Sequence, residues 1–282
     1  MNTIKGTSRI VGIFGDPVTY SLSPQMHNYV FEKLHLDFVY VPFVVRRGQV
    51  AQAVNAIRAL HLLGVNVTIP HKETVIPHLD HLAPMAIKAG AVNTIVNHGG
   101  KLTGHNTDVS GFIDSLKLDG EFNPSHKKAL IYGAGGVSRA MSLALIESGI
   151  SKITILNRTL KNAKTLQSDL HKNAPNAAIT VLPSTQETLE QCISECDLFI
   201  NATPSGPETP LIPSNIFVFD AVYAEVTPLL IAAKKSGAKC LGGLDMLIRQ
   251  GALAFSLWTG LEPPAKLMRE ALKQIGSYNS SL

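Results

Sequence analysis

The sequence has few of the residues that mark disulfide-rich or metal-bound proteins. Its 282 residues include only three cysteines, which is too few for a disulfide framework or a four-cysteine metal site. Cys192 and Cys196 lie four residues apart on an expected helix, where we interpret them as packing residues, and Cys240 stands alone. His78 and His81 lie close together without a third candidate ligand, so we expect no metal site. This cysteine usage fits a reducing cytoplasm.

Long hydrophobic runs and strong charge are also missing. No apolar run reaches the roughly 18 residues that cross a bilayer, and the first residues lack the apolar core of a signal peptide. We therefore expect a cytoplasmic protein without a membrane partner. The formal net charge of +4 has no lysine or arginine block behind it, which fits small anionic ligands and argues against nucleic acid. With 45% hydrophobic and 16% charged residues, the chain should be globular, with two domains or one large one.

A strand–glycine–helix pattern over residues 128–140 is the most informative feature that is present. An apolar run at 129–132 precedes the turn GAGG at 133–136, and a helical pattern follows. Glycines let the backbone approach a pyrophosphate, and the free N–H groups at a helix N-terminus hold the anion. Ser138 stands where the usual dinucleotide pattern has its third glycine, so a plain glycine turn in some other α/β protein stays an alternative.

The next strand predicts which dinucleotide would bind. It covers residues 152–156 and ends in Asn157-Arg158-Thr159, about 20 residues after the glycine turn, where an NAD-binding protein usually carries an acid. The guanidinium of Arg158 instead offers forked donors to a phosphate. We therefore expect a 2′-phosphate pocket and NADP rather than NAD, with a solvated arginine at a strand end as the alternative.

Strands and helices alternate along the rest of the chain. The spacing predicts further strands at residues 10–14, 39–45, 63–69, 91–96, 102–105, 178–182, 197–202, 217–223 and 238–241. It predicts helices at residues 49–60, 109–118, 160–170, 244–258 and 264–275, and one more that begins at Ser23 as N-cap before Pro24. This alternation favours an α/β fold in which a second α/β unit precedes a doubly wound nucleotide-binding unit.

Three polar residues stand out as candidates for chemistry. Hydride transfer to a carbonyl leaves an oxyanion that must gain a proton, so an acid–base group is needed. Lys72 follows directly on an apolar strand, and Asp108 could fix its ammonium group. A surface lysine and a helix N-cap are the alternatives for these two residues. Gln250 lies on a helix that is apolar on two stripes, so its amide needs a polar partner or a ligand.

Several short motifs occur in an order that identifies a family. They are SLSP at 21–24, NVTIPHK at 66–72, GAVNT at 90–94, NTD at 106–108, GAGG at 133–136, NRT at 157–159, NATP at 201–204 and GGLDML at 242–247, followed by Gln250. In the identity and order of these motifs the chain resembles the shikimate dehydrogenases, and the resemblance extends over nearly the whole chain. The resemblance implies NADP-linked reduction of 3-dehydroshikimate to shikimate, on the route to chorismate and the aromatic amino acids.

The resemblance also implies roles for particular residues and segments. It implies a substrate domain of residues 1–107 and 243–282, an NADP-binding Rossmann domain of residues 108–242, and a cleft between them. It implies Lys72 and Asp108 as the catalytic pair. The residues implied to bind the substrate are Ser21, Ser23, Thr68, Asn93, Tyr223 and Gln250. Those implied to bind the cofactor are Gly133, Ala134, Gly135, Gly136, Asn157, Arg158, Thr159, Thr203, Gly243 and Met246. Asp245 is a departure, because relatives often carry an uncharged residue there.

Two other functions stay open from the sequence. A quinate/shikimate dehydrogenase that uses NAD would tend to lose one of the two serines and to carry an acid after the ribose strand, whereas this chain keeps both serines and has Arg158. A dinucleotide-binding regulator without turnover would need the glycine turn but not Lys72 or Asp108. Homodimerisation is a further option that the sequence does not decide.

Overall fold

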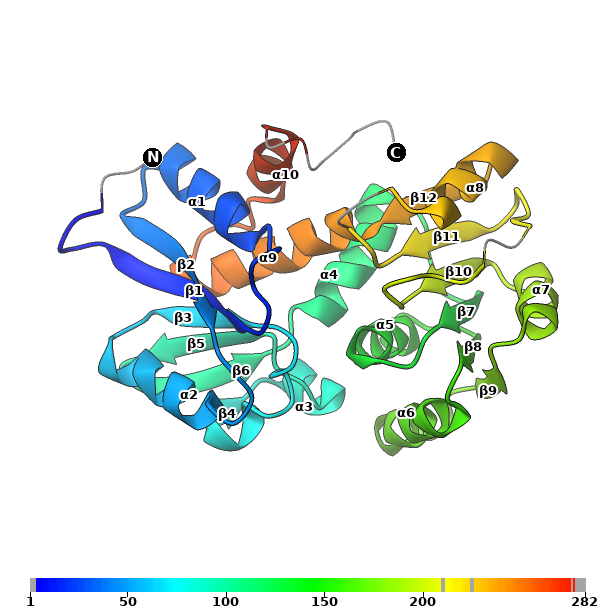
Figure 1. The fold of residues 1–282 in the computed structure, drawn as a ribbon, viewed down its shortest axis with the longest axis horizontal. Helices are drawn as coiled ribbons and strands as arrows, with labels where there is room; N and C mark the ends of the chain where they lie inside the picture. The colour runs from blue at the N-terminus through cyan, green and yellow to red at the C-terminus, as the bar shows by residue number, and fades with distance from the viewer. Residues whose placement is uncertain (1–3, 209–210, 224–225, 275, 277–282) are drawn as a thin grey trace. The chain divides into compact units, whose positions relative to one another are not determined.

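The computed structural model describes residues 4–208, 211–223, 226–274 and 276, and these fold into two compact units. The first unit runs to Thr107 and resumes at Gln250, and the second covers Asp108–Arg249. The chain therefore leaves the first unit once, after Thr107, and returns within helix α9 (Gly243–Thr259). Figure 1 shows the elements of both units.

The first unit is built on a six-stranded mixed sheet with the strand order β2-β1-β3-β5-β6-β4. Its strands are β1 (Arg9–Gly15), β2 (Phe38–Val44), β3 (Gly64–Val67), β4 (His81–Leu82), β5 (Thr94–His98) and β6 (Lys101–His105). Strand β1 pairs in parallel with β2 and β3, whereas β5 runs antiparallel to both β3 and β6. A tight turn joins β5 to β6, with Gly99 and Gly100 both at positive φ.

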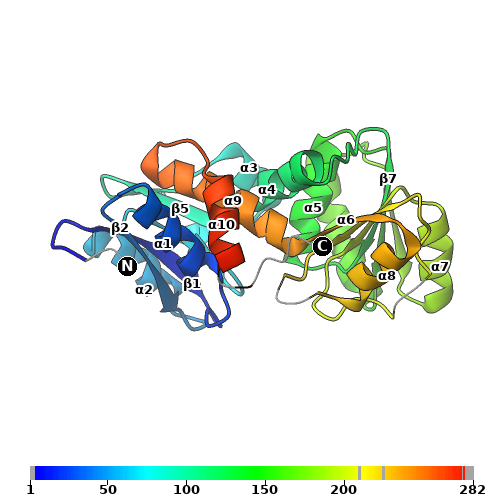
Figure 2. The same ribbon diagram turned by 90° about the horizontal axis from the view of Figure 1, so that it is seen from above.

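Helices cover both faces of this first sheet. Helices α1 (Ser23–Lys33) and α10 (Ala265–Gln274) lie side by side on one face (Figures 1 and 2). Helix α2 (Val50–Ala59) packs on the other face, in one apolar cluster with residues of the short helix α3 (Pro84–Ala89). A 3-10 turn at Ile76–His78, strand β4 and helix α3 were not predicted, because each is too short to show a hydrophobic period.

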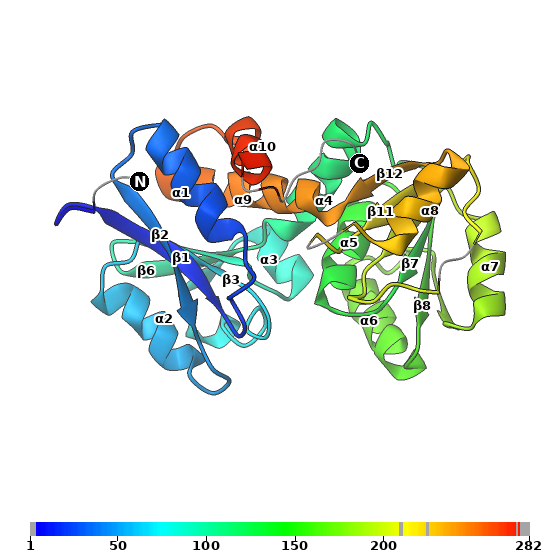
Figure 3. The same cartoon turned by 45° about the horizontal axis from the view of Figure 1, so that its top comes forward.

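The second unit has a six-stranded, fully parallel sheet with the order β12-β11-β10-β7-β8-β9. Its strands are β7 (Lys128–Tyr132), β8 (Lys152–Asn157), β9 (Ile179–Pro183), β10 (Leu198–Asn201), β11 (Phe217–Asp220) and β12 (Lys239–Gly242). Its helices are α4 (Asp108–Asp114), α5 (Gly136–Glu147), α6 (Leu160–Asn173), α7 (Gln186–Ser194) and α8 (Pro228–Ser236). Figure 3 shows α5 and α6 on one side of this sheet and α7 and α8 on the other. This is the doubly wound arrangement that the sequence predicts.

Two local predictions are wrong. Ser23 is not an N-cap: α1 begins at Ser23 itself, and no side chain caps it. Cys196 is not on the helix of Cys192, because α7 ends at Ser194, although both thiols pack against the same apolar cluster. The helix predicted over residues 109–118 is helical throughout, as an α-helix to Asp114 and then as one π-helical turn, Ser115–Asp119.

Two further findings complete the fold. The last predicted helix matches α10, although Ile275, its predicted final residue, lies outside the described residues. Among the described helices, none combines the length and the apolar character that a bilayer-crossing segment requires.

Candidate active site

A cluster of buried amide and hydroxyl groups lies in the first unit, where β3 and β5 meet the return of the chain at Gln250. Asn93 Nδ2 donates to Thr107 Oγ1 at 2.9 Å and to Gln250 Oε1 at 3.4 Å. Asn93 Oδ1 accepts from the Thr107 backbone N–H at 2.7 Å. Asn66 Nδ2 donates to Thr94 Oγ1 at 3.0 Å. The structure thus brings together two predicted substrate ligands, Asn93 and Gln250, in a set of neutral donors and acceptors.

Tyr40 also hydrogen-bonds to this cluster, and the two predicted serines hydrogen-bond to each other. The Tyr40 hydroxyl donates to Asn66 Oδ1 at 2.7 Å. The Ser23 backbone N–H donates to Ser21 Oγ at 3.3 Å. Ser23 is buried and Ser21 half-buried, which leaves the Ser21 hydroxyl closer to solvent. Burial raises the pKa of the Tyr40 phenol far above its usual range, so it stays protonated.

Thr68 and Lys72 follow strand β3 in the same unit. Thr68 is half-buried, and its backbone N–H donates to the Phe14 oxygen at 2.9 Å. The backbone oxygen of Lys72 accepts from Val92 N–H at 2.7 Å, which ties Lys72 to the residue before Asn93. The Lys72 side chain is half-buried. A half-buried lysine whose backbone is bonded to the residue before Asn93 is a candidate for proton transfer.

The glycine turn of the second unit has the backbone that anion binding requires. Gly133 has a φ of +115°, and a Cβ placed there would lie 2.7 Å from Thr203 Cγ2 and 3.0 Å from the Ala202 oxygen. Gly135 precedes the first turn of α5, and open space surrounds both Gly135 and Gly136. A phosphate could therefore approach the N–H groups at the start of α5 without meeting a side chain.

The residues expected to hold the nucleotide surround this turn on neighbouring strand ends. Asn201 holds Thr203 in place. The Thr203 backbone N–H donates to Asn201 Oδ1 at 3.0 Å, and the Thr203 hydroxyl donates to the same oxygen at 2.8 Å. Asn157 ends β8 and donates from Nδ2 to the Thr159 oxygen at 2.8 Å, which shapes the loop around Arg158. The Arg158 side chain is exposed and contacts no acid within the described part of the chain. A cation held in this way can accept a phosphate.

The other predicted residues also belong to the second unit. Asp108 is the first residue of α4, where its carboxylate lies at the positive end of the helix. Ala134 and Tyr223 are half-buried in the loops after β7 and β11. Gly243 and Met246 lie in the first turns of α9, where a Cβ on Gly243 would come within 2.3 Å of the Ala221 oxygen.

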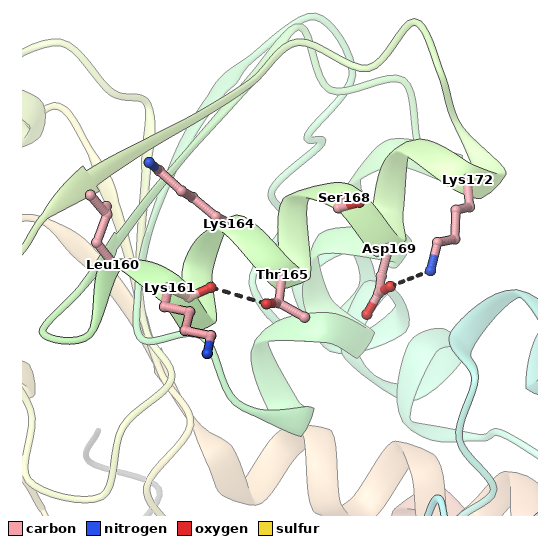
Figure 4. A pocket seen from close by; sticks show the side chains of 7 residues that line it. All are labelled: Leu160, Lys161, Lys164, Thr165, Ser168, Asp169 and Lys172. Carbon is pink, nitrogen blue, oxygen red and sulfur yellow. Dashed lines mark hydrogen bonds and ion pairs between the residues drawn. The ribbon is translucent and has the colours of Figure 1, made fainter.

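A hollow of about 600 Å³ runs along the exposed face of α6, but it is lined by none of the candidate residues (Figure 4). Two of its side chains, Asp169 and Lys172, form an ion pair at 2.7 Å, and Arg139 also bonds Asp169 at 2.8 Å. These two cations lower the pKa of Asp169. We interpret this hollow as a solvated helix face, because all of its lining residues belong to α6.

The described residues contain no group of three or more histidines, cysteines or acids that could hold a metal ion.

Comparison with known proteins identifies the family. The models named Shikimate dehydrogenase substrate binding domain, Shikimate / quinate 5-dehydrogenase and Shikimate 5'-dehydrogenase C-terminal domain match residues 13–95, 117–218 and 243–273. A protein of Desulforamulus reducens named Shikimate dehydrogenase (NADP(+)) is 43% identical, with 96% of this chain and 97% of that protein aligned. The chain belongs to the shikimate dehydrogenase family.

Solved structures of the shikimate dehydrogenase family share the whole fold. Shikimate 5-dehydrogenase of Listeria monocytogenes, in complex with shikimate and NAD, is 35% identical with a TM-score of 0.88, covering 96% of this chain and 99% of that one. Shikimate 5-dehydrogenase of Thermus thermophilus, in complex with NADP(H) and shikimate, is 36% identical with a TM-score of 0.83, covering 94% and 99%. The expected α/β fold with a Rossmann-type unit is thereby confirmed.

Sequence reasoning missed four residues of the polar cluster of this shikimate dehydrogenase family member: Tyr40, Asn66, Thr94 and Thr107. Asn66, Thr94 and Thr107 lie inside the quoted motifs, so a signal for them was present. Tyr40 lies in a strand of ordinary apolar pattern, and only the three-dimensional pairing of β1 with β2 and β3 brings its hydroxyl to Asn66.

Proposed function

We propose that the protein is a shikimate dehydrogenase that reversibly reduces 3-dehydroshikimate to shikimate with NADPH. The observation that carries the proposal is that one chain combines the buried amide–hydroxyl cluster with Lys72 in one unit and the glycine turn with Arg158 in the other. Its relatives named Shikimate dehydrogenase (NADP(+)) align with it over nearly their full length, which supports both the substrate and the cofactor.

The first unit is the proposed substrate unit. A polyhydroxylated ring needs neutral donors and acceptors, and Asn93, Gln250 and Thr68 supply them. Ser21 and Ser23 offer hydroxyls for the ring carboxylate, for which neutral donors are sufficient. Tyr223, although part of the second unit, is proposed as a further contact to the substrate.

The second unit is the proposed NADP unit. Residues 133–136 fit a pyrophosphate because their backbone N–H groups are open to approach, and Thr203, Gly243 and Met246 are proposed to hold the nicotinamide half. Asn157, Arg158 and Thr159 are proposed to bind the 2′-phosphate, because Arg158 is exposed and contacts no acid among the described residues, which favours an anion. The cofactor supplies the hydride when it is bound.

Lys72 and Asp108 are proposed to manage the proton. When the carbonyl carbon gains hydride, its oxygen becomes negative, and the Lys72 ammonium donates the proton that yields the hydroxyl of shikimate. In the reverse direction the Lys72 amine accepts that proton. Asp108 is proposed to hold the ammonium in place and to accept a hydrogen bond from a substrate hydroxyl. We expect this reaction to take place in the cytoplasm.

Steady-state assays of the purified protein test the function. We expect shikimate and NADP⁺ to give reduced cofactor, followed by its absorbance, with a kcat/KM for NADP⁺ at least tenfold above that for NAD⁺. Quinate in place of shikimate serves as the comparison substrate. Equal use of NAD⁺ would make the cofactor assignment wrong, and cofactor binding without any turnover would favour a regulator.

A further inference from the structure

A buried carboxylate, that of Asp220, lies at the end of β11 in the second unit. Asp220 pairs in register with Asn201, the last residue of β10, and both residues are fully buried. Asp220 Oδ1 accepts from Asn201 Nδ2 at 2.8 Å and from the Val222 backbone N–H at 3.0 Å. Asp220 Oδ2 accepts from the hydroxyl of Thr227, the N-cap of α8, at 2.6 Å. The two oxygens therefore hold different parts of the chain.

The orientation of the Asn201 side-chain amide is fixed by backbone groups. The Thr203 backbone N–H can only donate, and it lies 3.0 Å from Asn201 Oδ1. The NH₂ group therefore faces two acceptors, the Thr203 backbone oxygen at 3.1 Å and the Asp220 carboxylate. Exchanging the two amide atoms would turn these bonds into repulsive contacts. Asp220 thus receives a definite donor from Asn201.

The same reasoning fixes the Thr203 side chain. Its oxygen accepts the Gly206 backbone N–H at 3.1 Å, and its one hydroxyl proton goes to Asn201 Oδ1 at 2.8 Å. The methyl group lies against the glycine turn, because a Cβ built on Gly133 would come within 2.7 Å of Thr203 Cγ2. The position of this methyl group beside the turn depends on Asn201, and through Asn201 on Asp220.

Asp220 Oδ1 also reaches a second loop. Val222, whose N–H donates to Oδ1, accepts the Gly243 backbone N–H on its own oxygen at 3.2 Å. The chain is close-packed there, since a Cβ on Gly243 would lie 2.3 Å from the Ala221 oxygen. One carboxylate oxygen therefore joins the two loops that carry Thr203 and Gly243, both of which are proposed to hold the nicotinamide half of NADP.

We propose that Asp220 is a positioning residue for the nicotinamide half of the cofactor, which acts by holding the Thr203 and Gly243 loops to its Oδ1 atom. This inference rests on the proposed function. Without that acceptor, Asn201 and Val222 keep buried donors without their partner, and the cofactor itself must order the two loops, which weakens its binding. The 2′-phosphate is proposed to bind elsewhere, at residues 157–159, so the adenosine half should be insensitive to Asp220.

The test compares two ligands by calorimetry on the full chain. One is NADP⁺, and the other is adenosine 2′,5′-bisphosphate, which lacks the nicotinamide half. Asp220→Ala is expected to raise the dissociation constant of NADP⁺ about 5-fold to 50-fold and to leave that of adenosine 2′,5′-bisphosphate within about twofold of the parent. A merely structural role of Asp220 would not separate the two ligands.

Two further variants complete the test. Asp220→Asn keeps an acceptor oxygen for Asn201 and Val222, and its NH₂ group can face the Thr227 oxygen, so it should bind NADP⁺ within about threefold of the parent. Thr185→Ala is the control, because it removes the N-cap of α7 without a bond to either loop. It should lower the melting temperature and leave both dissociation constants unchanged.

Unchanged NADP⁺ binding by folded Asp220→Ala would overturn the inference, as would equal weakening of both ligands or an Asp220→Asn protein as weak as Asp220→Ala. Should Asp220→Ala not fold, Thr203→Val decides. It keeps a methyl group toward Gly133 but loses the hydroxyl bonds, so it should weaken NADP⁺ alone, and unchanged NADP⁺ binding contradicts the proposal. A parent protein that does not bind NADP⁺ would instead remove the proposed function, which separates the two failures.

Discussion

At the scale of single residues, His27 is the most unusual group in the first unit. It is completely buried, and neither ring nitrogen has a hydrogen-bond partner among the residues that the structure describes. Desolvation lowers its pKa from 6.5 to about 3, so the folded protein holds a neutral imidazole at pH 7. Its contacts are aromatic rings, of Tyr40, Phe31 and Trp258. His27 therefore serves as a flat packing group.

This burial predicts a dependence of stability on pH. Below about pH 6.5 the unfolded chain binds a proton at His27 that the folded chain refuses until about pH 3, so stability falls as the pH falls through this window. The slope for one proton is about 1.4 kcal/mol per pH unit. His27→Phe cannot bind this proton. In urea denaturation the free energy of unfolding of the parent should fall by about 1.4 kcal/mol more than that of His27→Phe between pH 7.5 and pH 5.5. Equal losses in the two proteins would mean that His27 is not the group responsible.

Arg158 makes a prediction about cofactor choice. Its guanidinium is exposed and is proposed to bind the 2′-phosphate, which NAD lacks. Arg158→Ala should raise the KM for NADP⁺ by about 10-fold to 100-fold, the effect of losing charge-assisted hydrogen bonds, and leave the KM for NAD⁺ within about twofold. Lys152→Ala, at the exposed start of the same strand, is the control. An equal rise in KM for NADP⁺ and NAD⁺ would contradict the assignment of Arg158 to a 2′-phosphate pocket.

The sequence predicts single residues well where the backbone alone sets their role. The glycine turn and Arg158 were predicted from their place after expected strands, Gln250 from its place on an apolar helix, and Asn93 from motif likeness. Tyr40 could not be predicted in this way, because its partner Asn66 lies on a strand distant in the sequence. The Ser23-Pro24 pair indicates an N-cap at Ser23, but α1 begins at Ser23 itself and no side chain caps it.

At the scale of elements, long strands and helices were predictable and short ones were not. Strands β7, β10 and β11 of the second unit are buried on both faces, so their apolar runs show clearly in the sequence. Strand β4 has two residues and α3 has six, which is less than one hydrophobic period needs. The π-helical turn Ser115–Asp119 has no sequence signal of its own.

The turn between β7 and α5 gives a test at this scale. Gly133 has a φ of +115°, and an added Cβ would meet Thr203 and the Ala202 oxygen, so Gly133→Ala adds backbone strain to a steric overlap. We expect a loss of about 1–3 kcal/mol in the free energy of unfolding. Gly136→Ala is the matched comparison, because nothing lies within 4 Å of its added Cβ, and its stability should change by less than about 0.5 kcal/mol. Denaturant titration measures both, and similar losses would contradict this geometry.

At the scale of the whole molecule, the chain builds two units of different sheet type and joins them at Thr107 and within α9. The mixed sheet presents a polar cluster suited to a hydroxylated ring, and the parallel sheet presents a nucleotide turn. Alternating strands and helices predict both units, but not the exact residue at which α9 passes from one to the other.

The most direct test of the proposed acid–base role of Lys72 is the turnover of shikimate by the Lys72→Ala variant. We predict that kcat falls by about 10²-fold to 10⁴-fold while the KM for shikimate changes by less than about threefold. Lys101→Ala, an exposed lysine at the start of β6, should keep the kcat of the parent. A Lys72→Ala enzyme with kcat within about twofold of the parent would contradict the acid–base role on which the account depends.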